Sequence, residues 1–559
     1  MAEIDSDRNR SALEMSCRKE LLSDAMKRTS EWILSLEIPS DITVNVGGTS
    51  FALHKFPLVS KCGYIRKLVT QSSGVVDCSV LDIPDVPGGA AGFEFAAKFC
   101  YGISFSIAVD NAAMVRCVAE FLEMTEEYGP GNLIVRTEEF VNDEVLKSLT
   151  GAVSVLHSSE RFIPMAERVN LVSRCVDTVA FLACQVSQFV GMEDMASSGA
   201  KSWAKCLIVL RIDFFRRIVV AMIARGLNER ALILVLMLYA RESLRDLEVS
   251  GEAKNNENDR KYSHEKRVVL ETIVSLLPRD RNTVPVTFLS TLLRAAMFVE
   301  TTVACRLDLE KRIATQLDNA SLEDLLFPAN SITDDTLFDI ETAKRIMLDF
   351  LEFYVKPNEK GFHFPPSPSA IEQATRLMEN YLTHVASDPN LSVLEFVSLA
   401  EVIPRQHRWR QDGIYGAIDA YFKAHPALSD TERKKVCNAV DFEKLSPEPR
   451  AHAETNDRLP VETIVRLICH ERRHSREWLD DEVLGSPGPR LATDEALRLE
   501  NRELRMEVVE MKRRLKEMEK EKSCNEVGVV HWKSFVSSIS RRFSKFVVRG
   551  NGNGNGNEP

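Results

Sequence analysis

One stretch of the sequence has the residue types and spacing of a zinc hydrolase. His470-Glu471-Arg472-Arg473-His474 matches the pattern His-Glu-x-x-His, which places two imidazoles one helical turn apart to bind zinc beside a glutamate base. The two arginines inside the motif would bring positive charge close to the metal, and no third ligand is evident. We therefore interpret the motif as a solvated helix end, with a zinc hydrolase as the alternative.

Other catalytic patterns are missing from the sequence. Gly47-Gly48 is interpreted as a hairpin turn, because no Gly-rich loop ending in Lys-Ser or Lys-Thr accompanies it, and no Gly-x-Ser-x-Gly elbow is present. Cys62 and Cys100 stand in apolar helical contexts, which are typical of buried structural thiols. We expect no enzymatic activity and no cofactor. The cysteines stand singly along the chain, at Cys17, Cys62, Cys78, Cys100, Cys117, Cys175, Cys184, Cys206, Cys305, Cys437, Cys469 and Cys524.

The composition indicates a folded protein of several domains. The chain has 559 residues, of which 44% are hydrophobic and 27% charged, and this length predicts two to four domains of about 100 to 200 residues each. The net charge of -11 gives no field that would attract nucleic acid. The longest apolar run, Ala231–Ala240, is too short to span a bilayer, which takes roughly 20 residues. We expect a cytoplasmic protein with reduced thiols.

The elements of the N-terminal part are those of a mixed domain. After a flexible N-terminus at residues 1–30, the segment 41–53 alternates around Gly47-Gly48, which predicts a β-hairpin. A helical stretch follows, then a strand at 80–83, and further helices whose apolar residues recur at helical spacing. We predict an α+β domain over residues 31–140.

The long middle of the chain is predicted to be all-α. Amphipathic segments of helix length continue without strand alternation, first as a helical connector at 141–200 and then as a large helical domain at 201–475. Three polar or Pro-rich breaks, at 192–201, 249–262 and 356–369, are predicted to be exposed loops.

The C-terminal part has a heptad pattern and a low-complexity end. Beyond a linker at 476–492, apolar residues at Leu497, Leu504, Met511 and Met518 predict a short coiled coil over 493–523, with a single exposed helix as the alternative. The Asn-Gly repeat at 550–559 cannot build a core and is predicted to be disordered.

Residues 529–549 contain five Lys or Arg and no acidic residue. At 100° per residue the apolar and basic side chains separate, which predicts a basic amphipathic helix on an anionic membrane surface. The protein would then lie peripherally at the plasma membrane. Docking of the apolar face onto the helical domain or a partner's groove is the alternative. The candidate membrane face comprises Trp532, Phe535, Ile539, Phe543 and Phe546, with Arg541, Arg542 and Lys545 beside them.

The N-terminal motifs resemble those of a known domain. Residues 40–58 read SDITVNVGGTSFALHKFPL, 83–89 read IPDVPGG, and 93–102 read FEFAAKFCYG. This order and spacing closely resemble a BTB/POZ domain. The helical segments LRIDFF at 210–215, CRLDLE at 305–310 and DGIY at 412–415 extend the resemblance. It covers about residues 30–475 and the coiled coil, and points to the plant non-phototropic hypocotyl three and root phototropism two-like family.

The resemblance implies a substrate-recognition adaptor of a cullin-3 RING ubiquitin ligase in plant signalling such as phototropism or auxin-related responses. The alternative is a membrane-associated scaffold without a role in ubiquitin transfer. Cullin-3 would bind the BTB domain, and client proteins or receptor kinases the helical domain. Animal cullin-binding BTB domains often carry a hydrophobic-x-Glu motif before the strand that we place at 80–83, and the nearest candidate here is Val75-Val76-Asp77.

The resemblance also assigns roles to individual residues. Asp41, His54 and Lys55 would specify the BTB fold and a homodimer, or a heterodimer with related BTB proteins. A titratable switch is the alternative for His54.

Four residues are candidate phosphorylation sites. Ser544 follows Arg541-Arg542-Phe543 and so resembles a basophilic kinase site, with Ser540 and Ser538 as competing candidates. Phosphorylation there would release the tail from a membrane, and the resemblance implies that it could recruit 14-3-3 proteins. Tyr421 lies in a segment whose tyrosine is proposed to be phosphorylated in the family, although a tyrosine on an amphipathic helix usually packs.

Pro447 and Pro449 are expected to shorten or bend their helix.

Overall fold

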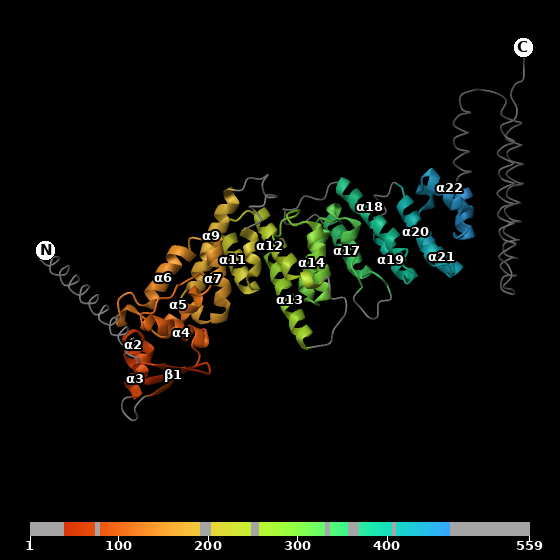
Figure 1. Cartoon of the computed structure of the whole chain (residues 1–559). Coiled ribbons are helices and arrows are strands. Elements are labelled where there is room, and N and C mark those ends of the chain that lie inside the picture. The colour runs from red at the N-terminus through yellow and green to blue at the C-terminus, as the bar shows by residue number, and fades with distance from the viewer. Residues whose placement is uncertain are drawn as a thin grey trace, which may run out of the picture. The chain divides into compact units, whose positions relative to one another are not determined.

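The computed structural model of the protein describes residues 38–72, 79–189, 203–247, 257–329, 336–355, 368–404 and 410–469. Figure 1 shows a small sheet in the N-terminal part of this described chain and helices through the rest of it. The mixed N-terminal domain and the all-α region are therefore present as predicted. The predicted coiled coil, basic helix and both terminal tails lie outside the described residues.

The N-terminal domain begins with the predicted hairpin. Strand β1 (Ile42–Val46) pairs antiparallel with β2 (Thr49–Leu53), with Val46 opposite Thr49. Gly47 and Gly48 have φ of +56° and +81°, as a two-residue turn of type I′ requires. Strand β3 (Val80–Asp82) adds to β1 in parallel, so that the sheet order is β2-β1-β3.

Helices cover this sheet and complete the domain. Because side chains alternate along a strand, Ile42, Val44 and Val46 all enter the core from β1. The helices are α2 (Lys55–Lys61), α3 (Gly63–Ser72), α4 (Gly89–Cys100), α5 (Ala112–Phe121), the 3₁₀ turn η1 (Glu126–Tyr128) and α6 (Leu133–Phe140).

The remaining elements are helical. They are η2 (Val141–Val145), α7 (Leu149–Ser159), η3 (Glu160–Phe162), α8 (Met165–Arg168), α9 (Leu171–Phe189), η5 (Leu207–Val209), α11 (Ile212–Ala224), α12 (Glu229–Ser243), η6 (Arg245–Leu247), α13 (Glu257–Leu276), α14 (Val286–Phe298), α15 (Val303–Ala314), η7 (Leu317–Asn319), α16 (Leu322–Leu325), α17 (Ile340–Val355), α18 (Pro368–Val385), α19 (Val393–Val402), α20 (Asp412–Ala424), α21 (Asp430–Cys437), η9 (Phe442–Lys444) and α22 (Pro447–Thr455).

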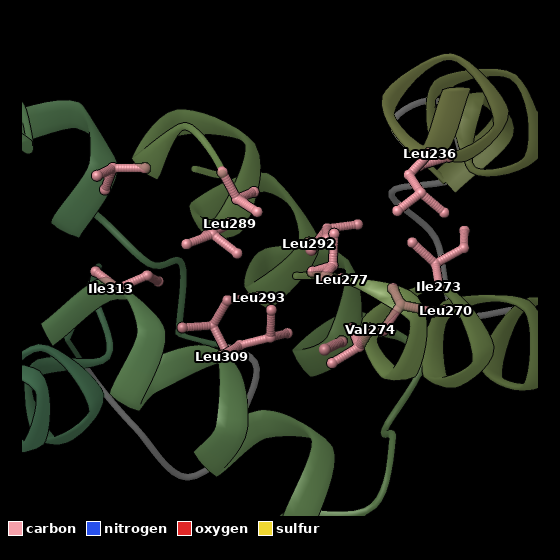
Figure 2. Packing of buried hydrophobic residues seen from close by; sticks show 14 of the residues in the cluster. Leu236, Leu270, Ile273, Val274, Leu277, Leu289, Leu292, Leu293, Leu309 and Ile313 are labelled. Atoms are coloured by element: carbon pink, nitrogen blue, oxygen red, sulfur yellow. The ribbon is translucent and has the colours of Figure 1, made fainter. Parts of the chain in front are cut away.

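These helices pack in two alternating rows. Helices α11, α13, α15, α17, α19 and α21 each contact the next member of that series, and α14, α16, α18 and α20 form a second series. Aliphatic side chains of α12 to α15 share one hydrophobic core, and in Figure 2 Leu236 faces Ile273 while Leu293 lies beside Leu309. Each helix therefore depends mainly on its neighbours along the chain, as in helical repeat proteins.

Two local predictions need correction. The segment 249–262 was expected to be a loop, but α13 already begins at Glu257, because its polar residues form the first turns of a helix whose apolar face starts further on. Pro447 and Pro449 do not bend a helix, because they stand in the first turn of α22. Backbone N–H groups there have no intrahelical acceptor, so proline is tolerated.

Helix α5 belongs to two hydrophobic cores. Val115, Val118 and Ala119 pack into the core of the N-terminal domain. Ala112, Ala113 and Cys117 pack into the core of the helical region. Because these small side chains allow a close approach, α5 contacts both α7 and α8, and one helix connects the two domains.

We predict that a methyl group at position 92 of α4 disrupts the packing of α5 against α4. A Cβ there would lie 2.1 Å from the Pro87 carbonyl oxygen and 2.7 Å from the Val118 Cγ2. Gly92→Ala should therefore lower the free energy of unfolding by about 1–3 kcal/mol, as overpacking does. The measurement is the midpoint of urea-induced unfolding.

The matched control is Gly416→Ala in α20, where a Cβ would meet nothing within 4 Å. This change should raise the stability by about 0.5–1 kcal/mol, because alanine favours a helix over glycine. Similar shifts for the two variants would contradict the close approach at Gly92.

Candidate protein-interaction surfaces and the joints that position them

His54 joins the hairpin to the end of α4. Its backbone N–H donates to the Tyr101 hydroxyl at 2.7 Å, its Nδ1 lies 2.8 Å from the same hydroxyl, and its Nε2 lies 2.9 Å from the Ile38 carbonyl oxygen. A neutral imidazole with its proton on Nε2 satisfies all three contacts, because the hydroxyl then donates to Nδ1. Burial raises the pKa of Tyr101, so the hydroxyl keeps its proton. His54 thus holds this corner together.

Asp41 completes the same corner. Its Oδ1 accepts a hydrogen bond of 2.7 Å from the Lys55 backbone N–H at the start of α2. The residue at the helix N-cap, His54, makes no side-chain cap, so a carboxylate from before β1 takes that role. Asp41, His54 and Lys55 therefore meet in one place, and the contacts between them maintain the fold. Their role in a dimer stays a prediction.

Ion pairs connect the shared helix α5 to α6 and α9, and we call this contact between helices the Glu138 joint. Arg116, whose side chain is 9% exposed, binds Glu138 of α6 through Nε at 2.6 Å and Glu120 through NH1 at 2.9 Å. The other oxygen of Glu138 accepts from Arg174 of α9 at 2.6 Å. Burial alone would raise the pKa of Glu138, but the two guanidinium groups outweigh it and leave that pKa lowered. The carboxylate stays ionised between two cations from different helices.

Sequence reasoning missed this joint. Arg116 interrupts the apolar run AAMVRCVAEF at residues 112–121, and a charge within a buried helix face needs a partner. That signal predicts a buried ion pair but does not identify Glu138 or Arg174.

The segment at 210–215 forms a joint between α11 and α12. The Tyr239 hydroxyl donates to the Leu210 carbonyl oxygen at 2.9 Å, and its ring stacks on Phe215 with centroids 3.7 Å apart. Burial raises the pKa of Tyr239 to about 12, so the hydroxyl remains a donor. This motif therefore serves packing.

The segment at 305–310 forms a second joint. Glu310 of α15 is only 3% exposed and accepts two hydrogen bonds, of 3.0 and 2.9 Å, from the Arg345 guanidinium of α17. Arg345 also donates to the Thr342 hydroxyl at 2.7 Å. Paired hydrogen bonds of this kind fix the orientation as well as the distance of the two groups, so they set the spacing of α15 and α17.

The segment at 412–415 positions the C-terminal helices. A Cβ on Gly413 would lie 3.1 Å from the Glu379 Cβ in α18, which is tighter than an ordinary contact, so glycine eases the close packing of α18 and α20. Asp412 accepts from the Ser446 backbone N–H at 2.9 Å, just before α22. The Tyr415 hydroxyl lies 2.7 Å from the His452 Nδ1 within α22.

A polar network continues from this point along α20. Asp419 accepts from Asn456 at 2.9 Å and pairs with Lys423 at 2.6 Å, and Arg458 lies 3.6 Å away. Burial would raise the pKa of Asp419, but the hydrogen bonds from Lys423 and Asn456 outweigh it and leave the pKa lowered. The charges are satisfied internally, which indicates a structural network.

Tyr421 is fully buried. Its hydroxyl donates to the Leu391 carbonyl oxygen at 2.9 Å, and its ring stacks between Phe396 and His425, with centroids 4.4 and 4.0 Å away. A kinase would need α20 to detach before it could reach this hydroxyl. The packing agrees with the structural interpretation of Tyr421.

The other predicted site residues lie outside the part of the chain that the structure describes. These are the candidate cullin motif at 75–77, His470 and His474 of the zinc motif, Ser540 and Ser544, and the whole candidate membrane face. Within the described ranges no group of three or more His, Cys, Asp or Glu side chains could hold a metal ion. In the same ranges no helix is long and apolar enough to cross a membrane.

Comparisons with known proteins agree with this architecture. A model of the NPH3 family matches residues 201–449. BTB/POZ domain-containing protein SR1IP1 of Arabidopsis thaliana is 52% identical over 473 residues, which cover 82% of this chain and 78% of the relative. Root phototropism protein 2 of Arabidopsis thaliana is 35% identical over 545 residues, which cover 94% and 91%.

The fold combines an α+β domain that begins with a β-hairpin and an all-α domain, and helix α5 packs into the cores of both. This combination defines a class of two-domain BTB-type proteins. Within this class, the chain belongs to the NPH3 family of plant BTB/POZ domain-containing proteins. The helical motifs at 210–215, 305–310 and 412–415, on which the resemblance rested, all form contacts between helices.

We predict that the Glu138 joint loses its contribution to stability in acid. Because the folded-state pKa of Glu138 is below its usual value of 4.5, its stabilising effect is complete above that value and disappears as the pH falls through the folded-state pKa. Glu138→Gln should cost about 1–3 kcal/mol at pH 7. Urea unfolding of both proteins across a pH series is the measurement.

The difference between wild type and Glu138→Gln should stay constant from pH 7 to about pH 5 and shrink at lower pH. Glu139→Gln, at an exposed neighbouring position, is the control and should have little effect. A Glu138→Gln penalty that does not change with pH would contradict the ionised joint.

Proposed function

We propose that this protein is a substrate-recognition adaptor of a cullin-3 RING ubiquitin ligase. The BTB-type domain would bind cullin-3, and the outer faces of the helical domain would bind client proteins or receptor kinases. The observation that carries the proposal is the shared helix α5, whose side chains enter both cores. A ligase adaptor needs such a connection, because a bound client must stay at a fixed place relative to the transferring enzyme.

The helical domain supports the proposal through its surface. Its family motifs are used for internal joints, so they leave the outward-facing residues free to differ between proteins without loss of the fold. Large apolar side chains stand exposed there, including Val303 at 61% and Leu394 at 77%. A bound client that covered these side chains would remove apolar surface from water, which favours association.

We predict that the full-length protein binds purified cullin-3 with a Kd of roughly 1 µM or below, equivalent to about 8 kcal/mol. Val75→Asp should weaken binding at least tenfold, because it places a charge in the candidate cullin motif. Leu394→Asp, on α19 of the helical domain, should leave the Kd unchanged. The measurement is isothermal titration calorimetry.

Two results would count against the cullin proposal. One is no measurable binding of the full chain at about 10 µM. The other is equal weakening by Val75→Asp and Leu394→Asp, since that would reflect general damage to the fold. Shortening the chain is a poor substitute for these variants, because removal of the helical region would expose the second face of α5.

A second candidate function is a membrane-associated signalling scaffold, and the basic run at 529–549 favours it. Each Lys or Arg close to an anionic surface contributes about 1 kcal/mol. The peptide 529–549 should therefore co-sediment with vesicles that contain phosphatidylserine. Phe535→Asp should reduce binding, whereas Phe535→Leu should retain it. If the Asp and Leu peptides sediment alike, the apolar face does not bind lipid.

A further inference from the structure

Two cysteines that are 38 residues apart meet in the core of the BTB-type domain. The Sγ atoms of Cys62 and Cys100 lie 3.5 Å apart, and both residues are free thiols with exposures of 1% and 2%. Cys62 is the C-cap of α2, and Cys100 is the last residue of α4. We propose that this thiol pair is a redox modification site, which a peroxide converts into an intramolecular disulfide.

The surrounding contacts hold the two backbones together before any oxidation. The Lys61 ammonium donates to the Phe99 carbonyl oxygen at 3.1 Å and lies over the Phe99 ring at 4.6 Å. The Asn132 side chain donates to the Lys61 carbonyl oxygen at 3.0 Å. These bonds flank both cysteines, so the sulfurs need to approach by only about 1.5 Å to reach the disulfide length of roughly 2.05 Å.

Other buried thiols of the described chain differ from this pair. Cys117 and Cys175 are buried, and burial raises the pKa of each thiol to about 12. Among the described residues, neither forms a sulfur–sulfur hydrogen bond like that of Cys62 with Cys100. The arrangement at Cys62 and Cys100 is therefore not a general result of burying cysteines.

The chemistry balances with a peroxide as the only oxidant. One thiol loses its proton, and its thiolate attacks a peroxide oxygen, which gives a sulfenic acid and one water when the peroxide is H₂O₂. The second thiol then attacks the sulfenic sulfur, which forms the S–S bond and releases a second water. Two thiols are oxidised by two electrons in total, and one peroxide is reduced.

The site responds slowly for a physical reason. The hydrogen bond with Cys100 and burial raise the pKa of Cys62, so little thiolate exists near neutral pH, and solvent must enter before a peroxide can react. Brief opening around Cys62, the single residue between α2 and α3, would admit the oxidant. Once formed, the disulfide joins the end of α2 to the end of α4, next to the Tyr101 contact with His54.

The test treats the reduced full-length protein with hydrogen peroxide, blocks remaining thiols with N-ethylmaleimide in denaturant, and identifies linked peptides by mass spectrometry. A Cys62–Cys100 peptide should appear that dithiothreitol removes, while Cys117 and Cys175 stay alkylated. The rate should rise between about pH 7 and pH 9, because the thiolate is the reactive form. The melting temperature should rise and return on reduction.

The Cys62–Cys100 pair is compared with Cys117 and Cys175 in the same digest of the wild-type protein. The result therefore does not depend on whether the variants fold. Cys62→Ser and Cys100→Ser should each abolish the linked peptide, and Cys117→Ser should not. Alkylation of Cys62 and Cys100 to the same extent as Cys117 after peroxide would overturn the proposal. Linkage of either residue to a different cysteine would overturn it as well.

Discussion

The structure depends on one constraint, which is that α5 must satisfy two hydrophobic cores at once. One set of its side chains enters the BTB-type domain and a second set enters the helical region. Arg116 stands between them, where a buried guanidinium is tolerated only because Glu138 and Glu120 accept its hydrogen bonds. Arg174 of α9 binds the same Glu138, so the charged joint ties the α5–α6 pair to the first long helix of the helical region.

The rest of the helical region extends this arrangement by repetition. Each helix packs mainly on its neighbours in two rows, and polar joints such as Glu310 with Arg345 fix their spacing. The polar joints lie inside the domain, whereas the outer faces of the helices are exposed. Residues on those outer faces can therefore change while the fold is kept.

Much of the fold could be predicted from the sequence, because its signals are local. Alternation around Gly47-Gly48 predicted the hairpin, and helical spacing predicted the all-α region. The prediction failed where one composition suits two structures. Polar residues near 257 are equally typical of a loop and of an exposed helix start, and Pro447 and Pro449 stop a helix only when they stand beyond its first turn.

The fold class, the family and the apolar faces of the helices could all be inferred from the sequence, since these follow from residue order and periodicity. Which residues meet depends on the tertiary structure. The contact of Cys62 with Cys100, the burial of the Tyr421 hydroxyl and the sharing of Glu138 between Arg116 and Arg174 join positions far apart in the chain. Such contacts depend on how whole helices pack against one another, and no local pattern records that packing.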